Sequence, residues 1–172
     1  MRFRGKVAWV PGGGAGIGRG IVLAFAKEGA DVGVMDINRE TASQTAEEAK
    51  AFGVRALAIQ ADVASLEEVE RTVQELIQAF GKIDILVNNA GISPKRQGLK
   101  VPVVEMDPAE WEKVIAINLG GTFLCSRAVL PGMIGRKYGK IINISSVSGP
   151  ATPSMTPWPK RSGYRESFFS MA

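Results

Sequence analysis

The chain has 172 residues, 45% hydrophobic and 22% charged, which is typical of one soluble globular domain that buries roughly two thirds of its unfolded surface. Its net charge of +4 comes from basic residues that are interspersed with acids, so we expect no nucleic-acid partner. No apolar run approaches the about 20 residues of a membrane span, and no signal-like segment opens the chain, so we expect a cytoplasmic protein without membrane contact.

Histidine is absent from the sequence, and Cys125 is its one cysteine. This composition removes disulfides, most zinc chemistry and every catalytic triad built on histidine, and we expect no metal site. Cys125 sits in an apolar helical pattern, which favours a buried small side chain over a nucleophile.

The first segment, residues 6–36, has the order strand, glycine-rich loop, helix, strand, acid. An apolar run at Val7–Val10 leads into the loop, and a second run at Val32–Met35 ends in Asp36. Between them, apolar residues at helical spacing predict a helix that starts at the loop. The glycine cluster of the loop consists of Gly12, Gly13, Gly14, Gly16 and Gly18.

This arrangement predicts a nucleotide site. Glycines let the backbone turn and approach a ligand, and a helix N-terminus points unpaired N–H groups and a positive dipole end at the loop, which suits a pyrophosphate. Asp36 lies 18 residues beyond Gly18, where a carboxylate can bind both ribose hydroxyls of an adenosine and repel a 2′-phosphate. A glycine motif alone is equally consistent with a flexible loop, so the flanking strands, helix and acid carry the prediction.

The later segments alternate between helix and strand patterns. Helices are expected at Asn38–Phe52, from a capping box at Ser65 to Phe80, and from Pro108 past Asn118 towards Leu130. A loop is expected at residues 92–107. The further strands are expected at Val54–Gln60, Ile83–Val87 and Lys140–Ser146.

Apolar strands that alternate with helices predict an α/β fold with a doubly wound parallel sheet of Rossmann type. Ligands of such folds bind at the carboxyl ends of the strands. Small or polar residues follow every predicted strand: the glycine loop, Asp36, Asp62, Asn89-Ala90-Gly91 and Ser145-Ser146.

These residues resemble the short-chain dehydrogenase/reductase family over about residues 3–156. The matching motifs are Gly12-x-x-x-Gly16-x-Gly18, Asp62-Val63, Asn88-Asn89-Ala90-Gly91, Asn118 within a long helix and Ile144-Ser145-Ser146. The resemblance implies an NAD(P)-dependent oxidoreductase that transfers hydride between an alcohol and a carbonyl of a small-molecule substrate.

The resemblance also implies the roles of single residues. Ser146 and Asn118 would be catalytic. The cofactor contacts would be Gly12, Gly16, Ile17 and Gly18 at the pyrophosphate, Asp36 at the ribose, Asp62 and Val63 at the adenine, and Asn89, Ala90 and Gly91 along the nicotinamide half. Asp36, without a basic residue at Ala15 or Ile37, favours NAD over NADP.

The sequence departs from the family pattern after Ser146. The family places a Tyr-x-x-x-Lys pair on a helix about a dozen residues later, where the lysine lowers the tyrosine pKa for proton transfer. Residues 155–160 contain two prolines and no tyrosine, and Tyr164 is followed four residues later by Phe168. We therefore expect a nucleotide-binding domain at residues 1–156 that is C-terminally incomplete, and an unrelated irregular tail at residues 157–172.

Three hypotheses follow from this departure. The chain is a family oxidoreductase impaired by the missing pair, an inactive NAD-binding module, or a non-functional truncated product. A module could form a homo-oligomer or assemble with a full-length relative through the helix at residues 107–130. The last predicted strand would then be an exposed apolar edge, which predicts low solubility or pairing with another chain.

Overall fold

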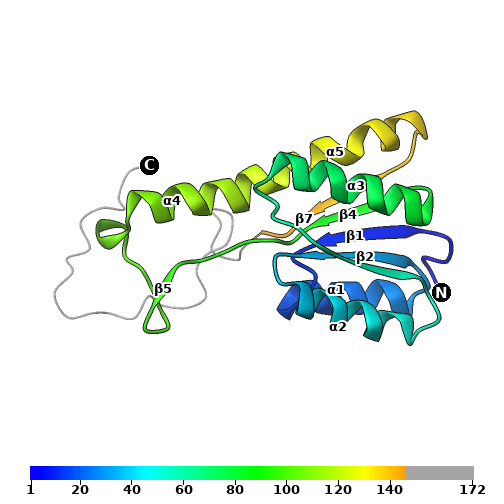
Figure 1. The fold of residues 1–172 in the computed structure, drawn as a ribbon, viewed down its shortest axis with the longest axis horizontal. Coiled ribbons are helices and arrows are strands. Elements are labelled where there is room, and N and C mark those ends of the chain that lie inside the picture. Colours follow the sequence, from blue (N-terminus) through cyan, green and yellow to red (C-terminus); the bar gives the residue numbers. More distant parts are fainter. Residues whose placement is uncertain (146–172) are drawn as a thin grey trace, which may run out of the picture.

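The computed structural model describes residues 1–145, which form a parallel sheet between two layers of helices (Figure 1). The five-stranded sheet has the order β3-β2-β1-β4-β7, and each neighbouring pair is parallel. Its strands are β1 (Val7–Pro11), β2 (Asp31–Asp36), β3 (Ala56–Gln60), β4 (Ile85–Asn88) and β7 (Lys140–Asn143). The predicted doubly wound fold is confirmed, with the central strand β1 next to the point where the strand order reverses.

Helices cover both faces of this sheet (Figure 1). Helices α1 and α2 pack on one face, and α3 and α5 pack on the other, while α4 extends past the carboxyl ends of the strands. The helices are α1 (Gly16–Lys27), α2 (Arg39–Lys50), α3 (Leu66–Phe80), α4 (Pro108–Ile115) and α5 (Gly121–Gly135).

The helix boundaries follow the capping residues that the sequence predicts. Asp107 accepts the N–H of Ala109 at 2.8 Å, and Gly81 ends α3 with φ of 84°. Ser65 accepts the N–H of Glu68 at 3.3 Å, as a capping box requires. The reciprocal bond is different, because the Glu68 carboxylate accepts the N–H of Asp62 at 2.8 Å and so fixes the turn after β3.

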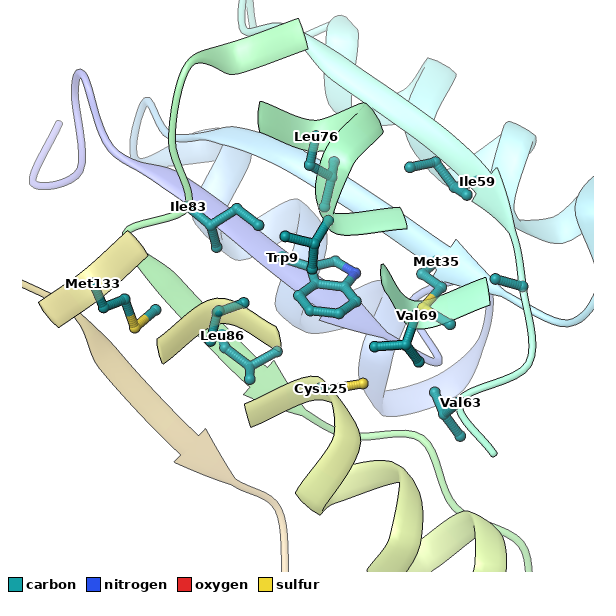
Figure 2. Close-up of a cluster of buried hydrophobic side chains, with 13 residues drawn as sticks. Trp9, Met35, Ile59, Val63, Val69, Leu76, Ile83, Leu86, Cys125 and Met133 are labelled. Carbon is teal, nitrogen blue, oxygen red and sulfur yellow. The ribbon is translucent and has the colours of Figure 1, made fainter. Parts of the chain in front are cut away.

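The larger core lies between the sheet and the α3/α5 layer, with Trp9 at its centre (Figure 2). Trp9 is fully buried among side chains from β2, β4, α3 and α5, including Leu76 and Cys125. Gly33 leaves the space that Leu76 fills, since a Cβ on Gly33 would lie 2.5 Å from the Leu76 side chain. The α/β layers are therefore held by close packing of small residues against large ones.

The segment predicted as a loop at residues 92–107 contains regular structure. A two-stranded hairpin pairs Lys95–Arg96 (β5) with Leu99–Lys100 (β6), and a 3₁₀ turn follows at Val103–Glu105. Gln97 and Gly98 make the turn with φ of 51° and 79°. The guanidinium of Arg96 donates to the Glu105 carbonyl and to the Glu110 carboxylate, both at 2.9 Å. Arg96 therefore ties the hairpin to α4.

The predicted helix from Pro108 is interrupted by a π-helical turn at Ala116–Gly120 (η2), which the sequence pattern did not indicate. The helical segment Pro108–Gly135 is long and apolar enough to cross a membrane by length and composition, because an 18-residue window in it has a mean hydropathy of 1.4. The sequence argument missed it because glycines and polar residues interrupt the apolar run. Its residues Cys125, Val129 and Met133 belong to the buried core, while most of the helix surface is exposed.

Strand β7 ends at Asn143, earlier than the predicted Ser146. Within residues 1–145 its pairing partner is β4, and the side chains of Ile142 in β7 and of Ile144 just after it are exposed. The described part of the sheet therefore ends at β7, next to exposed apolar side chains. Whether β7 is an uncovered edge depends on residues after 145, so this expectation stays a prediction. Ser146, the region of the expected Tyr-x-x-x-Lys pair and the tail at residues 157–172 lie outside the described residues.

Candidate cofactor site

The predicted site residues gather at the carboxyl edge of the sheet because each follows the end of a parallel strand. The glycine loop follows β1, Asp36 ends β2, Asp62 and Val63 follow β3, and Asn89, Ala90 and Gly91 follow β4. Asn118 reaches the same edge from η2. A shallow hollow of about 330 Å³ between α5 and β7, lined by Lys137 and Lys140 among others, contains none of these residues.

The glycine loop is pressed against the segment after β4. Gly12 has φ of 70°, and a Cβ there would lie 2.8 Å from Cα of Ala90. The Asn89 side-chain amide donates to the Gly12 carbonyl at 2.9 Å. A Cβ on Gly18 would overlap the same carbonyl, which lets α1 begin directly under the loop. Glycine at positions 12 and 18 is therefore a requirement of the local packing.

The outer side of the loop is open. Gly16 has φ of 52° with nothing within 4 Å of the position of a Cβ, and the Ile17 side chain is 69% exposed. Helix α1 starts at Gly16, so its unpaired N–H groups face this side. The loop, the helix start and the missing Cβ atoms fit a bound pyrophosphate.

Asp36 contacts the loop directly. One carboxylate oxygen accepts the N–H of Gly14 at 3.0 Å, and the other accepts the N–H of Asn38 at 3.0 Å. A carboxylate has about four acceptor positions, so positions remain for ribose hydroxyls. Sequence reasoning placed Asp36 beside the ligand and did not foresee that it also holds the loop.

The residues after β3 form a compact turn. The carboxylate of Asp62 accepts the N–H of Ala64 at 2.9 Å, and Val63 is buried. Val63 fits against α5 because a Cβ on Gly121 would lie 2.7 Å from its side chain. This turn therefore has a fixed backbone at the end of the sheet where an adenine is expected.

Asn118 is joined to the segment after β4 by a pair of bonds. Its side-chain oxygen accepts the N–H of Ile92 at 2.9 Å, and its side-chain nitrogen donates to the Ile92 carbonyl at 3.0 Å. Asn118 lies in the π-helical turn, a feature that is often found at functional sites. Its carbonyl accepts the hydroxyl of Thr122 at 3.0 Å.

A polar cluster under the site connects three elements. The buried Asn88 amide donates to the side-chain oxygens of Asn143 at 2.8 Å and Ser126 at 3.1 Å. These bonds fix the end of β7 relative to β4 and α5. The segment that leads to Ser146 therefore leaves the sheet from a held position, although Ser146 itself lies outside the described residues.

Cys125 is buried in the core and lacks the low thiol pKa of a nucleophilic cysteine. Burial raises the pKa of its thiol to about 12, so the thiolate is scarce at neutral pH. The prediction of a buried structural cysteine is confirmed. Residues 1–145 hold no group of three or more His, Cys, Asp or Glu side chains that could bind a metal ion.

Comparison with known sequences places this site in a family. The model of the short chain dehydrogenase family matches residues 6–164. The FabG 3-oxoacyl-[acyl-carrier-protein] reductase of Staphylococcus aureus is 44% identical over 145 residues, which are 84% of this chain and 57% of that protein. The (2S)-[(R)-hydroxy(phenyl)methyl]succinyl-CoA dehydrogenase subunit BbsD of Thauera aromatica is 39% identical over 92% of this chain and 62% of its own length.

Solved structures agree with this assignment. An NAD⁺-bound xylitol dehydrogenase superposes with a TM-score of 0.82 at 36% identity, over 89% of this chain and 57% of that one. A 7α-hydroxysteroid dehydrogenase complexed with NADH and 7-oxo glycochenodeoxycholic acid has a TM-score of 0.78 at 36% identity, over 85% and 55%. The chain thus spans somewhat more than half the length of the relatives that it matches, and it belongs to the short-chain dehydrogenase/reductase family.

Proposed function

We propose that this chain binds NAD along the carboxyl edge of its sheet. The observation that carries the proposal is the Asp36 carboxylate, which lies at the tip of β2 in contact with the glycine loop. Ala15 and Ile37 beside it carry no positive charge, so a 2′-phosphate would meet a carboxylate without a basic partner. The NAD⁺ and NADH in two solved relatives support a nicotinamide cofactor.

The expected contacts follow the edge of the sheet. Gly12, Gly16, Ile17 and Gly18 would hold the pyrophosphate, Asp36 the adenosine ribose, and Asp62 and Val63 the adenine. Asn89, Ala90 and Gly91 would line the nicotinamide half. The shape of the glycine loop supports this assignment, because the other glycines let it pack closely on the protein while Gly16 faces open space.

The reaction proposed for the family site is hydride transfer between a small-molecule alcohol or ketone and the cofactor, which supplies or accepts the hydride. Asn118 and Ser146 are the proposed catalytic residues. The sequence lacks the Tyr-x-x-x-Lys pair at residues 155–160, so we propose that turnover is strongly impaired and NAD binding retained. A cytoplasmic location is part of this proposal.

A fluorescence titration with NADH and NADPH tests the site. The unmodified protein should bind NADH more tightly than NADPH. Asp36→Ala should weaken NADH binding by about tenfold or more, because hydrogen bonds to a charged group are lost, and it should reduce the preference over NADPH. Asp31→Ala, at the other end of β2, removes the ion pair with Arg55 and should leave NADH affinity unchanged.

The outcomes separate the hypotheses. Equal or tighter binding of NADPH would contradict the assignment of Asp36, and absence of binding to either cofactor would contradict the site. Binding without oxidation of simple secondary alcohols supports an inactive module. Turnover would show that another group replaces the missing tyrosine.

The alternative function is a binding module that associates with a copy of itself or with a full-length relative. The specific observation is an exposed apolar stripe along one side of the helix Pro108–Gly135. The stripe consists of Trp111, Ile115, Leu119 and Phe123, spaced four residues apart across α4, η2 and α5. Residues 107–130 remain the proposed surface for this assembly.

A further inference from the structure

The glycine loop has a second anchor that lies outside the family motif. Thr45 is fully buried on α2, among the small side chains Ala42, Ala46 and Ala49. Its hydroxyl donates to the carbonyl oxygen of Gly14 at 3.0 Å. This bond joins α2 to the loop across 31 positions of sequence.

The acceptor of the Thr45 hydroxyl differs from that of the other helical threonines in residues 1–145. Among residues 1–145, the other helical threonines donate to a carbonyl three or four residues earlier: Thr41 to Asn38, Thr72 to Glu68 and Thr122 to Asn118. Such local bonds are the ordinary choice for threonine inside a helix. Thr45 instead donates to the Gly14 carbonyl in the glycine loop, so its hydrogen bond helps to fix the position of the loop relative to α2.

Both backbone polar groups of Gly14 are hydrogen-bonded to the protein. Its N–H donates to Asp36 and its carbonyl accepts from Thr45, while the preceding Gly13 donates to the Met35 carbonyl at 3.0 Å. Gly14 is buried, and a Cβ there would lie 2.6 Å from the Thr41 hydroxyl oxygen. Helix α2 therefore sets the position of the loop from behind, and the open side at Gly16 and Ile17 stays free.

We infer that Thr45 is a positioning residue of the nucleotide site, which acts by fixing the Gly14 peptide so that the loop is preformed for the cofactor. This inference rests on the proposed NAD binding. A preformed loop loses less conformational freedom when the cofactor binds. Without the hydroxyl, the buried Gly14 carbonyl has no donor and the loop can leave this position.

The test compares two chemically identical changes. Thr45→Val keeps the shape and removes the hydroxyl, and Thr72→Val does the same at an equally buried threonine whose hydroxyl donates within its own helix. We expect Thr45→Val to raise the Kd for NADH about tenfold, and Thr72→Val to leave it unchanged within about twofold. Thr45→Ser, which keeps the hydroxyl, should restore most of the affinity.

A second measurement does not depend on cofactor binding. In the ligand-free protein, the ¹⁵N–¹H NMR signals of Gly13 and Gly14 should shift in Thr45→Val and stay in place in Thr72→Val and Thr45→Ser. Unchanged NADH affinity and unchanged glycine signals in Thr45→Val would each overturn the inference. If the unmodified protein binds no NADH, the proposed function fails, and the glycine signals still decide whether Thr45 holds the loop.

Discussion

At the scale of single residues, the side chains proposed to bind the cofactor also form hydrogen bonds to the glycine loop. Asp36, the proposed ribose ligand, accepts the N–H of Gly14, and Asn89 after β4 donates to the Gly12 carbonyl. Such double contacts mean that a change in one side chain alters both the ligand surface and the loop behind it. Variants at Asp36 therefore need the control at Asp31 to separate binding from stability.

The sequence predicted that these residues lie at one edge of the sheet and missed the hydrogen bonds between them. Spacing after each strand was sufficient to select Asp36 and Asn89, because parallel strands bring their carboxyl ends to one edge. The role of Thr45 depends on how closely α2 approaches the loop, which no local pattern specifies. The one available signal was a polar residue on the otherwise alanine-rich buried face at positions 42, 45, 46 and 49.

The buried thiol of Cys125 makes stability depend on alkaline pH. Its folded pKa of about 12 is raised above the unfolded value of 9.0, so the unfolded state loses this proton first as pH rises. The contribution is fully present below pH 9.0 and is lost between pH 9.0 and about 12. We expect the free energy of unfolding to fall more steeply with pH over this range in the unmodified protein than in Cys125→Ala.

Urea unfolding curves at several pH values would measure this difference. The comparison between the two proteins removes the effect of lysines and other groups that titrate in the same range. Parallel pH profiles of the unmodified protein and Cys125→Ala would contradict the buried state of the thiol.

At the scale of elements, the helices and strands were predictable where caps and apolar periodicity agreed. Ser65, Gly81 and Asp107 marked real boundaries. The hairpin at residues 95–100 was missed because each strand is only two residues long, and its position depends on the side chain of Arg96. The π-helical turn was missed because it contains Asn118, whose side chain is hydrogen-bonded to the backbone of Ile92. Such a contact between distant segments leaves no local pattern in the sequence.

The exposed stripe on the helix Pro108–Gly135 gives a prediction at this scale. If the stripe is an association surface, Leu119→Lys places a charge in its centre and should convert the associated protein to monomer. Glu112→Lys adds positive charge to the same helix outside the stripe and should leave association unchanged. Sedimentation velocity measures both, and a chain that is monomeric at every concentration tested would contradict this surface.

At the scale of the whole molecule, the main core joins segments from nearly the full described length. Trp9 comes from β1 and Cys125 from α5, and both belong to one buried cluster (Figure 2). Because this cluster joins β1, β2, β4, α3 and α5, it favours cooperative unfolding of the described residues as one domain. The parallel topology was predictable from the alternation of elements, whereas the exposed β7 edge was expected only from comparison with the family pattern and stays a prediction.

Trp9 and Cys125 allow a direct test of cooperativity. In a variant with Trp111→Phe and Trp158→Phe, tryptophan fluorescence reports Trp9 alone, and thiol labelling reports Cys125. Both probes should give the same denaturant midpoint. A higher midpoint for Trp9 would mean that the first strands and helices form a structure that survives loss of α5.

The central position of β1 also has a consequence during synthesis. The apolar strand Val7–Pro11 is translated almost first, and its second neighbour β4 begins only at Ile85. At about 5–20 residues per second, the nascent chain therefore presents this strand without its full sheet for several seconds. The ribosome-bound chain carries its most buried segment uncovered, which makes residues 7–11 the expected contact for a chaperone that holds unfinished proteins.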